Sequence, residues 1–199
     1  MQLILTDLTW SQCLAYLDDI IVLGKDFEDH LKNLDAVIKR FQANNLKLKA
    51  KKCSLFKKEV VYLGKLISEK GISINLQNIE TIKKWPPPTS KKEVQSFLGF
   101  ANYHRDHISN LAHIACPLRE LTKKSSKFKW LDSHQNAFET LKNSIIQSAT
   151  LVYPYPDELF LLDTDASDKT VTTELLQVHD GKEYIVAYAS KVLTPAKNY

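Results

Sequence analysis

The sequence contains little cysteine and no long apolar run. Its three cysteines, Cys13, Cys53 and Cys116, are widely spaced and form no Cys-x-x-Cys pair. This pattern argues against a disulfide framework and a zinc site, and it is typical of a reducing compartment. No stretch approaches the ~20 apolar residues that span a membrane, and the N-terminus lacks the basic region of a signal peptide. We therefore expect an intracellular protein, cytoplasmic or nuclear, that is not secreted and binds no membrane.

The 199 residues, 44% of them hydrophobic and 25% charged, describe a globular protein of one large domain or two small ones. The net charge is only +4, but the lysines are clustered. The clusters are Lys47, Lys49, Lys51, Lys52, Lys57 and Lys58, and then Lys83, Lys84, Lys91 and Lys92. Local basic density of this kind is typical of phosphate contacts. A solvated surface that keeps the protein soluble is the alternative.

Apolar periodicity, caps and turn residues predict a mixed chain of helices and strands. The predicted helices cover 26–44 with Asp26 as cap, 75–85, a segment that starts in a capping box at Ser90, 110–123, which Pro117 bends or splits, and a helix capped by Asp132. The predicted strands cover a hairpin at 13–23, then 46–49, a second hairpin of 60–66 with 71–74, and finally 159–164, 170–178 and 184–188.

Two adjacent carboxylates interrupt the first of these hairpins. Asp18 and Asp19 stand between apolar segments, Cys13-Leu14-Ala15 and Ile20-Ile21-Val22-Leu23. Because an unpaired buried carboxylate is expensive to desolvate, the pair is expected at an exposed hairpin tip. An Asp-Asp turn and a carboxylate pair for magnesium-dependent phosphoryl chemistry both explain this pattern.

The segment Tyr16-Leu17-Asp18-Asp19-Ile20-Ile21-Val22 resembles the catalytic hairpin of reverse transcriptases from gypsy-type LTR retrotransposons. Later segments resemble the same family in the same order. They are His30-Leu31, Leu46-Lys47-Leu48, Lys52-Cys53, Val61-Tyr62-Leu63-Gly64, Gly71-Ile72, Trp85-Pro86, Thr89, Val94, Ser96-Phe97-Leu98-Gly99, Tyr103 and Leu162-Asp163-Thr164-Asp165-Ala166-Ser167-Asp168. The resemblance covers nearly the whole chain and points to the reverse transcriptase/RNase H region of a Pol polyprotein.

The resemblance implies an α+β fold with three parts. Residues 1–74 would form the C-terminal part of a polymerase palm, with the catalytic and primer-grip hairpins. Residues 75–124 would form a helical thumb or connector. Residues 125–199 would form a connection helix and an incomplete RNase H-like α/β domain.

The resemblance also implies two-metal nucleotidyl transfer with Mg²⁺, or Mn²⁺ in its place. Asp18, Asp19 and Asp165 are the implied catalytic and metal-binding carboxylates. Asp18 would bind the metals directly and Asp19 would be more peripheral, because adjacent residues of an extended chain point to opposite faces. Asp165 would belong to the RNase H-like site. The implied nucleic-acid-binding residues are Tyr16, Lys49, Lys52, Tyr62, Leu63 and Gly64.

Two departures from the family pattern affect this expectation. In the family another catalytic aspartate lies on an earlier strand, whereas only Met1–Gln12 precede the hairpin here, so we expect half of a polymerase metal site. The segment after Asp168 reads Lys169-Thr170-Val171-Thr172-Thr173-Glu174-Leu175, where the family has a glycine-rich strand.

The principal hypothesis is an RNA-directed DNA polymerase segment that binds an RNA or DNA template-primer duplex. It would act with the remaining Pol segments, namely fingers, upstream palm and the rest of RNase H. The alternative is a catalytically inactive retroelement remnant that binds duplex or has only a structural role.

Overall fold

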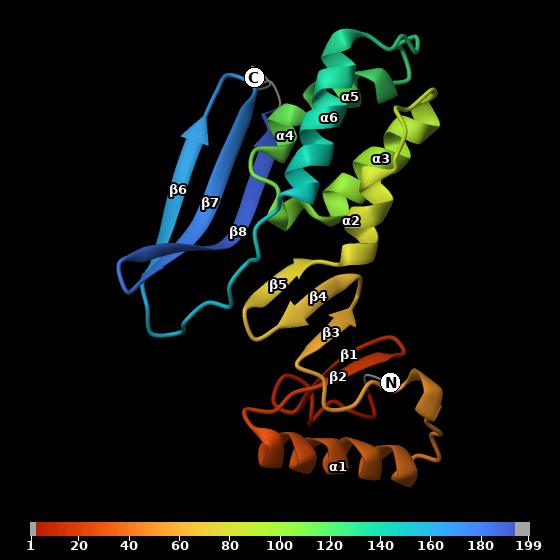
Figure 1. Cartoon of the computed structure of the whole chain (residues 1–199), viewed down its shortest axis with the longest axis vertical. Coiled ribbons are helices and arrows are strands. Elements are labelled where there is room, and N and C mark those ends of the chain that lie inside the picture. The colour runs from red at the N-terminus through yellow and green to blue at the C-terminus, as the bar shows by residue number, and fades with distance from the viewer. Residues whose placement is uncertain (1–2, 194–199) are drawn as a thin grey trace, which may run out of the picture. The chain divides into compact units, whose positions relative to one another are not determined.

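The computed structural model describes residues 3–193. The chain separates into two compact units, Met1–Leu63 and Gly64–Tyr199 (Figure 1). The division predicted at residues 74 and 124 stays a prediction. Within residues 3–193, no helix has the length and apolar character required to cross a bilayer.

Unit 1 combines a hairpin with one long helix. Strands β1 (Cys13–Tyr16) and β2 (Asp19–Val22) pair antiparallel, and α1 (Phe27–Ala43) packs beside them (Figure 1). A 3-10 turn, η1 (Ala50–Lys52), and strand β3 (Glu59–Tyr62) follow. The buried core of the unit is formed by Leu5, Leu8, Cys13, Val37 and Phe41.

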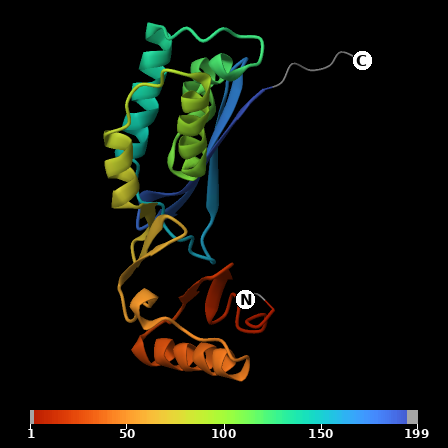
Figure 2. The ribbon, with the colours of Figure 1, turned by 90° about the vertical axis from the view of Figure 1, so that its right-hand side faces the viewer.

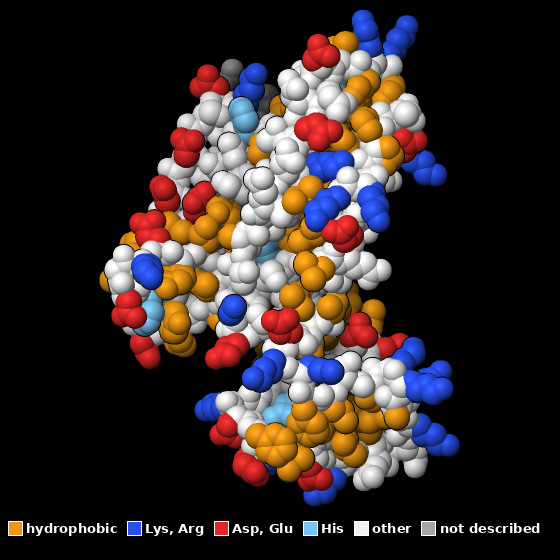
Figure 3. Space-filling model, viewed as in Figure 1, with side chains coloured by type: hydrophobic (Ala, Val, Ile, Leu, Met, Phe, Trp, Pro, Cys, Tyr) orange, Lys and Arg blue, Asp and Glu red, His pale blue; other side chains and the backbone are white. Residues whose placement is uncertain are grey.

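Helix α1 begins where the sequence predicts. The Asp26 side chain accepts a hydrogen bond from the Asp29 N–H at 2.8 Å, which satisfies one of the unpaired donors of the first turn. The apolar face is buried only toward its C-terminal half, at Val37 and Phe41, whereas Phe27 is exposed. Hydrophobic side chains are visible on the surface of this unit in Figure 3.

The strand predicted at Leu46–Lys49 is wrong. These residues have no regular secondary structure, and Leu48 is exposed. A strand requires hydrogen bonds to a neighbouring strand, and alternation of Leu and Lys predicts only which faces would be apolar. Leu46 alone packs against the core of unit 1.

Unit 2 opens with a second hairpin, in which β4 (Lys65–Ser68) pairs antiparallel with β5 (Gly71–Ile74). This confirms the hairpin predicted around Glu69 and Lys70. The single strand predicted at 60–66 is wrong, because Leu63 and Gly64 both have positive φ, 48° and 71°, and separate β3 from β4. Gly71 has a φ of 126°, and an added Cβ would clash with the Leu151 carbonyl, which explains the glycine.

The middle of unit 2 is helical. The helices are α2 (Leu76–Lys83), α3 (Lys91–Tyr103), η2 (Arg105–His107), α4 (Leu111–Ile114), α5 (Cys116–Thr122) and α6 (Asp132–Ile146). Their apolar faces meet in a core that includes Ile82, Phe97, Leu118, Phe138 and Ile145. Figure 2 shows these helices gathered beside the sheet of this unit.

Most helix ends confirm the capping prediction. The Ser90 hydroxyl accepts from the Glu93 N–H at 3.3 Å, while the Glu93 carboxylate accepts from the Thr89 N–H at 2.7 Å. Pro117 lies in the first turn of α5, where its missing N–H is harmless, so the predicted 110–123 helix is divided into α4 and α5. Asp132 is not the cap of α6. Leu131 holds that position, and its N–H donates to His134 Nδ1 at 2.9 Å.

The last part of unit 2 is a three-stranded antiparallel sheet in the order β6 (Phe160–Ala166), β7 (Thr170–His179) and β8 (Lys182–Val192). A register shift interrupts the β7–β8 pairing at Leu175 and Leu176. Strands β7 and β8 contact α4, and β8 also contacts η2. The predicted mixed fold of helices and sheets is confirmed.

Candidate catalytic hairpin and nucleic-acid-binding residues

The β1–β2 hairpin places the two acidic residues in different positions. Tyr16 pairs with Asp19 at the end of the ladder, so Leu17 and Asp18 form the connecting turn. Asp18 therefore lies at the tip, as predicted, whereas Asp19 is the first residue of β2. The two carboxylates are not equivalent in this geometry.

Solvent exposure explains how an apolar hairpin accommodates two carboxylates. Asp18, Asp19 and Tyr16 are exposed, while Cys13 at the other end of β1 is fully buried. The charges keep their hydration, and the hairpin buries its apolar end in the core of unit 1. Carboxylates presented in this way are accessible to a cation.

Tyr62 lies against this hairpin. Its hydroxyl approaches the Leu14 carbonyl on β1 at 3.5 Å, across 48 residues of sequence. Burial raises the pKa of Tyr62, and the negative charge of Asp19 acts in the same direction. Tyr62 therefore remains a protonated hydroxyl. The structure thus places Tyr16, Asp18 and Asp19 at one end of the hairpin and brings Tyr62 against the Leu14 carbonyl, within the electrostatic influence of Asp19.

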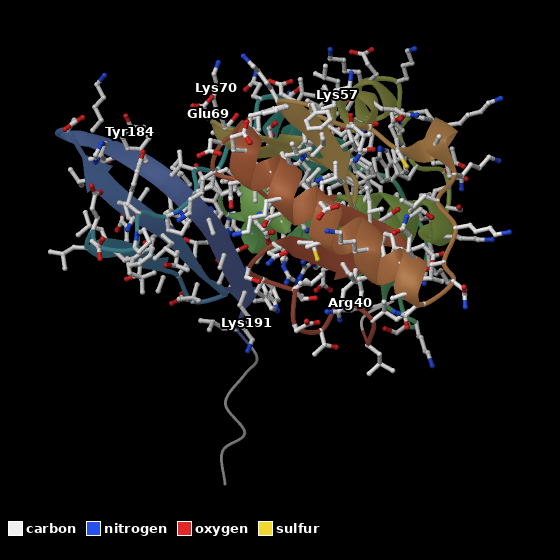
Figure 4. The ribbon with its side chains drawn as sticks, turned by 90° about the horizontal axis from the view of Figure 1, so that it is seen from below. Arg40, Lys57, Glu69, Lys70, Tyr184 and Lys191 are labelled. Carbon is white, nitrogen blue, oxygen red and sulfur yellow. The ribbon has the colours of Figure 1, made fainter. Side chains whose placement is uncertain are left out.

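Two residues that the sequence analysis missed hold α1 in place. The Asn33 amide, which is buried, donates to the Leu23 carbonyl just after β2 at 2.9 Å. Arg40 makes two hydrogen bonds to the Asp7 carboxylate, at 2.7 Å and 2.6 Å, and donates to the Ile4 carbonyl at 3.0 Å. Figure 4 labels Arg40 on α1. No local sequence signal pairs residues 33 positions apart.

The Asp7–Arg40 pair is charge-assisted and bidentate. The hydrogen bond from Arg40 lowers the pKa of Asp7, and the Asp7 carboxylate raises the pKa of Arg40. Both residues are therefore ionised near neutral pH. The pair attaches α1 to the N-terminal segment.

The other predicted nucleic-acid-binding residues are more scattered. Lys49 directly precedes η1 and Lys52 is its last residue; both side chains are exposed, and the Lys52 N–H donates to the Lys49 carbonyl at 2.8 Å. Leu63 is the last residue of unit 1, and Gly64 is the first of unit 2. Leu63 and Gly64 share the positive φ that is typical of two-residue turns between strands.

Asp165 lies on β6, in unit 2, and its side chain is exposed. It pairs with Thr172 on β7, while Asp163, two residues earlier on the same face, pairs with Glu174. The Ser109 hydroxyl donates to the Glu174 carboxylate at 3.0 Å. Among residues 3–193, no group of three or more His, Cys, Asp or Glu side chains is arranged to hold a metal ion.

The donors at the hairpin nevertheless suit a magnesium ion that is shared with substrate. Magnesium prefers oxygen ligands and commonly binds through one or two carboxylates together with waters and substrate phosphates, rather than in an all-protein cage. Asp18 and Asp19 supply hard, exposed carboxylate oxygens. Their chemistry therefore fits such an ion.

Comparison with protein families defines the class of this chain. Residues 1–67 match the family described as reverse transcriptase (RNA-dependent DNA polymerase). Residues 130–199 match the RNase H-like domain found in reverse transcriptase. The hairpin and the β6–β8 sheet thus lie in the two kinds of domain that the sequence motifs predicted.

The most informative relatives are retrotransposon polyproteins. The chain is 37% identical over 188 residues to the retrovirus-related Pol polyprotein from transposon 412 of Drosophila melanogaster. The aligned region covers 94% of this chain and 15% of that polyprotein. The chain is 34% identical over 191 residues to the transposon Tf2-3 polyprotein of Schizosaccharomyces pombe, covering 95% of this chain and 14% of that polyprotein. The chain is a reverse transcriptase/RNase H region of the LTR-retrotransposon type, and it spans about a seventh of these relatives' length.

Solved structures of foamy viral protease-reverse transcriptase share the fold. The dRH form in complex with double-stranded DNA aligns with a TM-score of 0.84 at 26% identity, over 98% of this chain and 34% of that chain. The complex with an RNA/DNA hybrid gives a TM-score of 0.82 at 26% identity, over 98% of this chain and 26% of that chain. Those relatives bind nucleic-acid duplexes, and the reverse transcriptase family depends in general on divalent metal ions.

Proposed function

We propose that this chain is part of an RNA-directed DNA polymerase that adds nucleotides to the 3′-hydroxyl of a primer on a template strand. The observation that carries the proposal is the β1–β2 hairpin, which presents Asp18 at its tip and Asp19 beside it, within the segment that matches reverse transcriptase. An RNA or DNA template-primer duplex and the remaining Pol segments are the proposed partners. The proposed location is intracellular, in the cytoplasm or nucleus.

The proposed roles follow from position. Asp18 at the tip would be the direct ligand of Mg²⁺, or of Mn²⁺ in its place, and Asp19 would be the more peripheral carboxylate. A bound pair of such ions would activate the primer hydroxyl and stabilise the leaving pyrophosphate. Tyr16 would pack near the primer terminus, since its exposed ring ends β1 directly before the turn.

The residues after the hairpin would position the nucleic acid. Tyr62 lies against β1, where its protonated hydroxyl donates to the Leu14 carbonyl, so it would support the grip on the primer through its position beside the hairpin. Leu63 and Gly64 would continue this grip, and the exposed side chains of Lys49 and Lys52 would contact phosphates. In unit 2, Asp165 on the exposed strand β6 would be a metal ligand of the RNase H-like domain.

Primer extension by the full chain tests the polymerase proposal. With magnesium, Asp18→Asn is expected to reduce extension by about 100-fold or more, because several kcal/mol of charge stabilisation would be lost. Asp19→Asn should reduce it less. Asp35→Asn, an exposed aspartate on α1, is the matched control and should leave extension unchanged. Equal extension by Asp18→Asn and the unaltered chain would overturn the role of Asp18.

Duplex binding distinguishes the alternative, a module that binds nucleic acid without catalysis. Affinity measured against salt should fall with a slope of about −0.9 for each phosphate contacted on a B-form duplex. Salt-dependent binding by the full chain without any magnesium-dependent extension would favour the binding module. Absence of binding at low salt would contradict both functions.

A further inference from the structure

Unit 2 contains a cavity of about 560 Å³ that no sequence motif predicted. Its lining comes from the end of α3, from η2, α4 and α5, and from the last residues of β8. The Ala112 N–H donates to the Ser190 hydroxyl at 2.9 Å, which connects α4 to β8. The cavity is therefore a product of packed elements, and its size lies in the range of ordinary ligand sites.

Basic side chains from three different elements line this cavity. They are Arg105 on η2, Arg119 on α5 and Lys191 on β8. Figure 4 shows Lys191 at the end of β8 near the last described residues, whereas Tyr184 lies toward the other end of that strand. Residues so far apart in the sequence meet only because η2 and α4 pack against β8.

The single carboxylate in the lining is already compensated. Asp106 accepts from Lys65 Nζ at 2.9 Å, and its other oxygen is 3.5 Å from Arg105 Nε. Burial opposes ionisation of Asp106, but the hydrogen bond and charge of Lys65 and the charge of Arg105 keep its pKa below the ordinary value. Within residues 3–193, neither Arg119 nor Lys191 has an ion-pair partner. Three cations against one carboxylate leave a net positive cavity.

Uncharged hydrogen-bond donors also line the cavity. The Ser190 oxygen accepts from Ala112, so its own hydrogen can be donated to a ligand. Burial raises the pKa of Tyr188, and the negative charge of Glu174 acts in the same direction, so the Tyr188 hydroxyl keeps its proton. Hydroxyl donors together with guanidinium and ammonium groups suit the oxygens of a phosphate.

We propose that this cavity binds a phosphate group of the nucleic-acid backbone, an inference that rests on the proposed function. The Arg105 side chain is 67% exposed at the rim, so the site is open to a group carried on a large polyanion. Tyr188 is the one aromatic residue in the described lining, and its ring is half-buried, so recognition depends on charge rather than on base stacking. These features favour a phosphodiester over a free nucleotide.

Charge removal in the cavity tests the proposal. The test variant is Arg119→Gln/Lys191→Gln in the full chain, and the matched control is Lys129→Gln/Lys182→Gln, which removes the same charge from exposed positions of unit 2. Duplex affinity is measured by fluorescence anisotropy from about 50 to about 200 mM salt. The cavity variant should bind about tenfold more weakly at about 100 mM salt, with a slope shallower by about two phosphate contacts. The control should stay close to the unaltered chain.

Three further measurements keep the result interpretable. Arg119→Lys retains the charge and should keep most of the affinity, and thermal unfolding verifies that each variant is folded. Titration with inorganic phosphate, followed by the amide NMR signals of Ser190 and Lys191, tests the free-phosphate source. The assignment to backbone phosphate would be overturned by a combination of two results. The chain would bind inorganic phosphate saturably, and duplex affinity would depend on salt with the same slope in the cavity variant and in the control.

The outcomes separate this proposal from the proposed function. Absence of salt-dependent duplex binding by the unaltered chain would contradict the proposed function, and the cavity assignment would fail with it. Duplex binding that the cavity variant and the control retain equally would overturn the cavity assignment alone. A selective loss in the cavity variant supports it.

Discussion

At the tip of the β1–β2 hairpin, Leu17 has a φ of 52°, in the left-handed region. For a residue with a Cβ this conformation costs roughly 1–2 kcal/mol, because the Cβ crowds the following carbonyl oxygen. The side chain is 71% exposed, so burial compensates little of this strain. The hairpin thus tolerates an unfavourable backbone angle beside Asp18. Backbone strain of this kind is often found at functional sites.

Replacing Leu17 with glycine should therefore stabilise unit 1. Glycine adopts positive φ without strain but loses more backbone entropy on folding, so the net gain in the free energy of unfolding should be about 0.5 kcal/mol. Urea denaturation followed by circular dichroism measures it. The control is Leu48→Gly, an exposed leucine outside the positive-φ set, which should destabilise slightly. Destabilisation of both variants to the same extent would contradict the strain argument.

At the scale of strands, β6 and β7 carry an unfavourable pair. Asp163 and Glu174 are direct partners in the antiparallel register, and like charges directly opposite each other repel. Glu174 is held by the Ser109 hydroxyl, whereas the Asp163 side chain is exposed. The repulsion therefore weakens the pairing of β6, the strand that also carries Asp165.

Neutralising Asp163 should strengthen the sheet. Asp163→Asn is expected to raise the free energy of unfolding by about 0.2–1 kcal/mol at low salt, and the gain should shrink as salt screens the repulsion. Chemical denaturation at two salt concentrations measures the difference. Asp157→Asn, an exposed loop position, is the control and should have no salt-dependent effect. A gain that is independent of salt would rule out charge repulsion as its cause.

Elements with local signals were predictable from the sequence. Helix α1 was predicted from Asp26 and its apolar period, and the division at Pro117 follows from the missing N–H of proline. Elements whose formation depends on contacts with distant parts of the chain were not predictable from the sequence. The alternation of Leu and Lys at Leu46–Lys49 could not reveal that these residues form no strand. The interruption at Leu63 depends on a positive φ that leucine seldom adopts.

At the scale of the whole molecule, the same distinction applies to the candidate sites. The tip position of Asp18 follows from an apolar pattern within a few residues. The approach of Tyr62 to Leu14 spans 48 residues, and the cavity of Arg105, Arg119 and Lys191 depends on helix packing against β8. Such sites arise from tertiary structure, so composition and spacing do not predict them.

The core of unit 2 also contains a titratable group that only the folded chain buries. His104 is fully buried at the end of α3, with its Nε2 3.4 Å from the Asn78 amide nitrogen. Burial lowers the pKa of His104 to about 4, and the charges of His107 and Lys65 act in the same direction. The pKa of His107 is also lowered, chiefly by burial. Both rings are therefore neutral in the folded protein near neutral pH.

These shifts should make unit 2 unstable in mild acid. Between pH 6.5 and about 4 the unfolded chain binds protons that the folded chain does not, so stability is greatest above pH 6.5 and is lost as pH falls. The difference between the two pKa values corresponds to about 3 kcal/mol for His104. His179 has the opposite sign, because its hydrogen bond to Glu158 raises its pKa and favours folding at low pH.

Thermal unfolding between about pH 5 and pH 7 measures this effect above the pKa values of ordinary carboxyl groups. The Tm of the unaltered chain should fall by on the order of 10 °C across this range. His104→Gln keeps an acceptor for Asn78 but cannot titrate, so its Tm should depend much less on pH. His113→Gln removes an exposed histidine of α4 and should follow the unaltered chain. A His104→Gln profile parallel to that of the unaltered chain would show that protonation of His104 does not drive the loss.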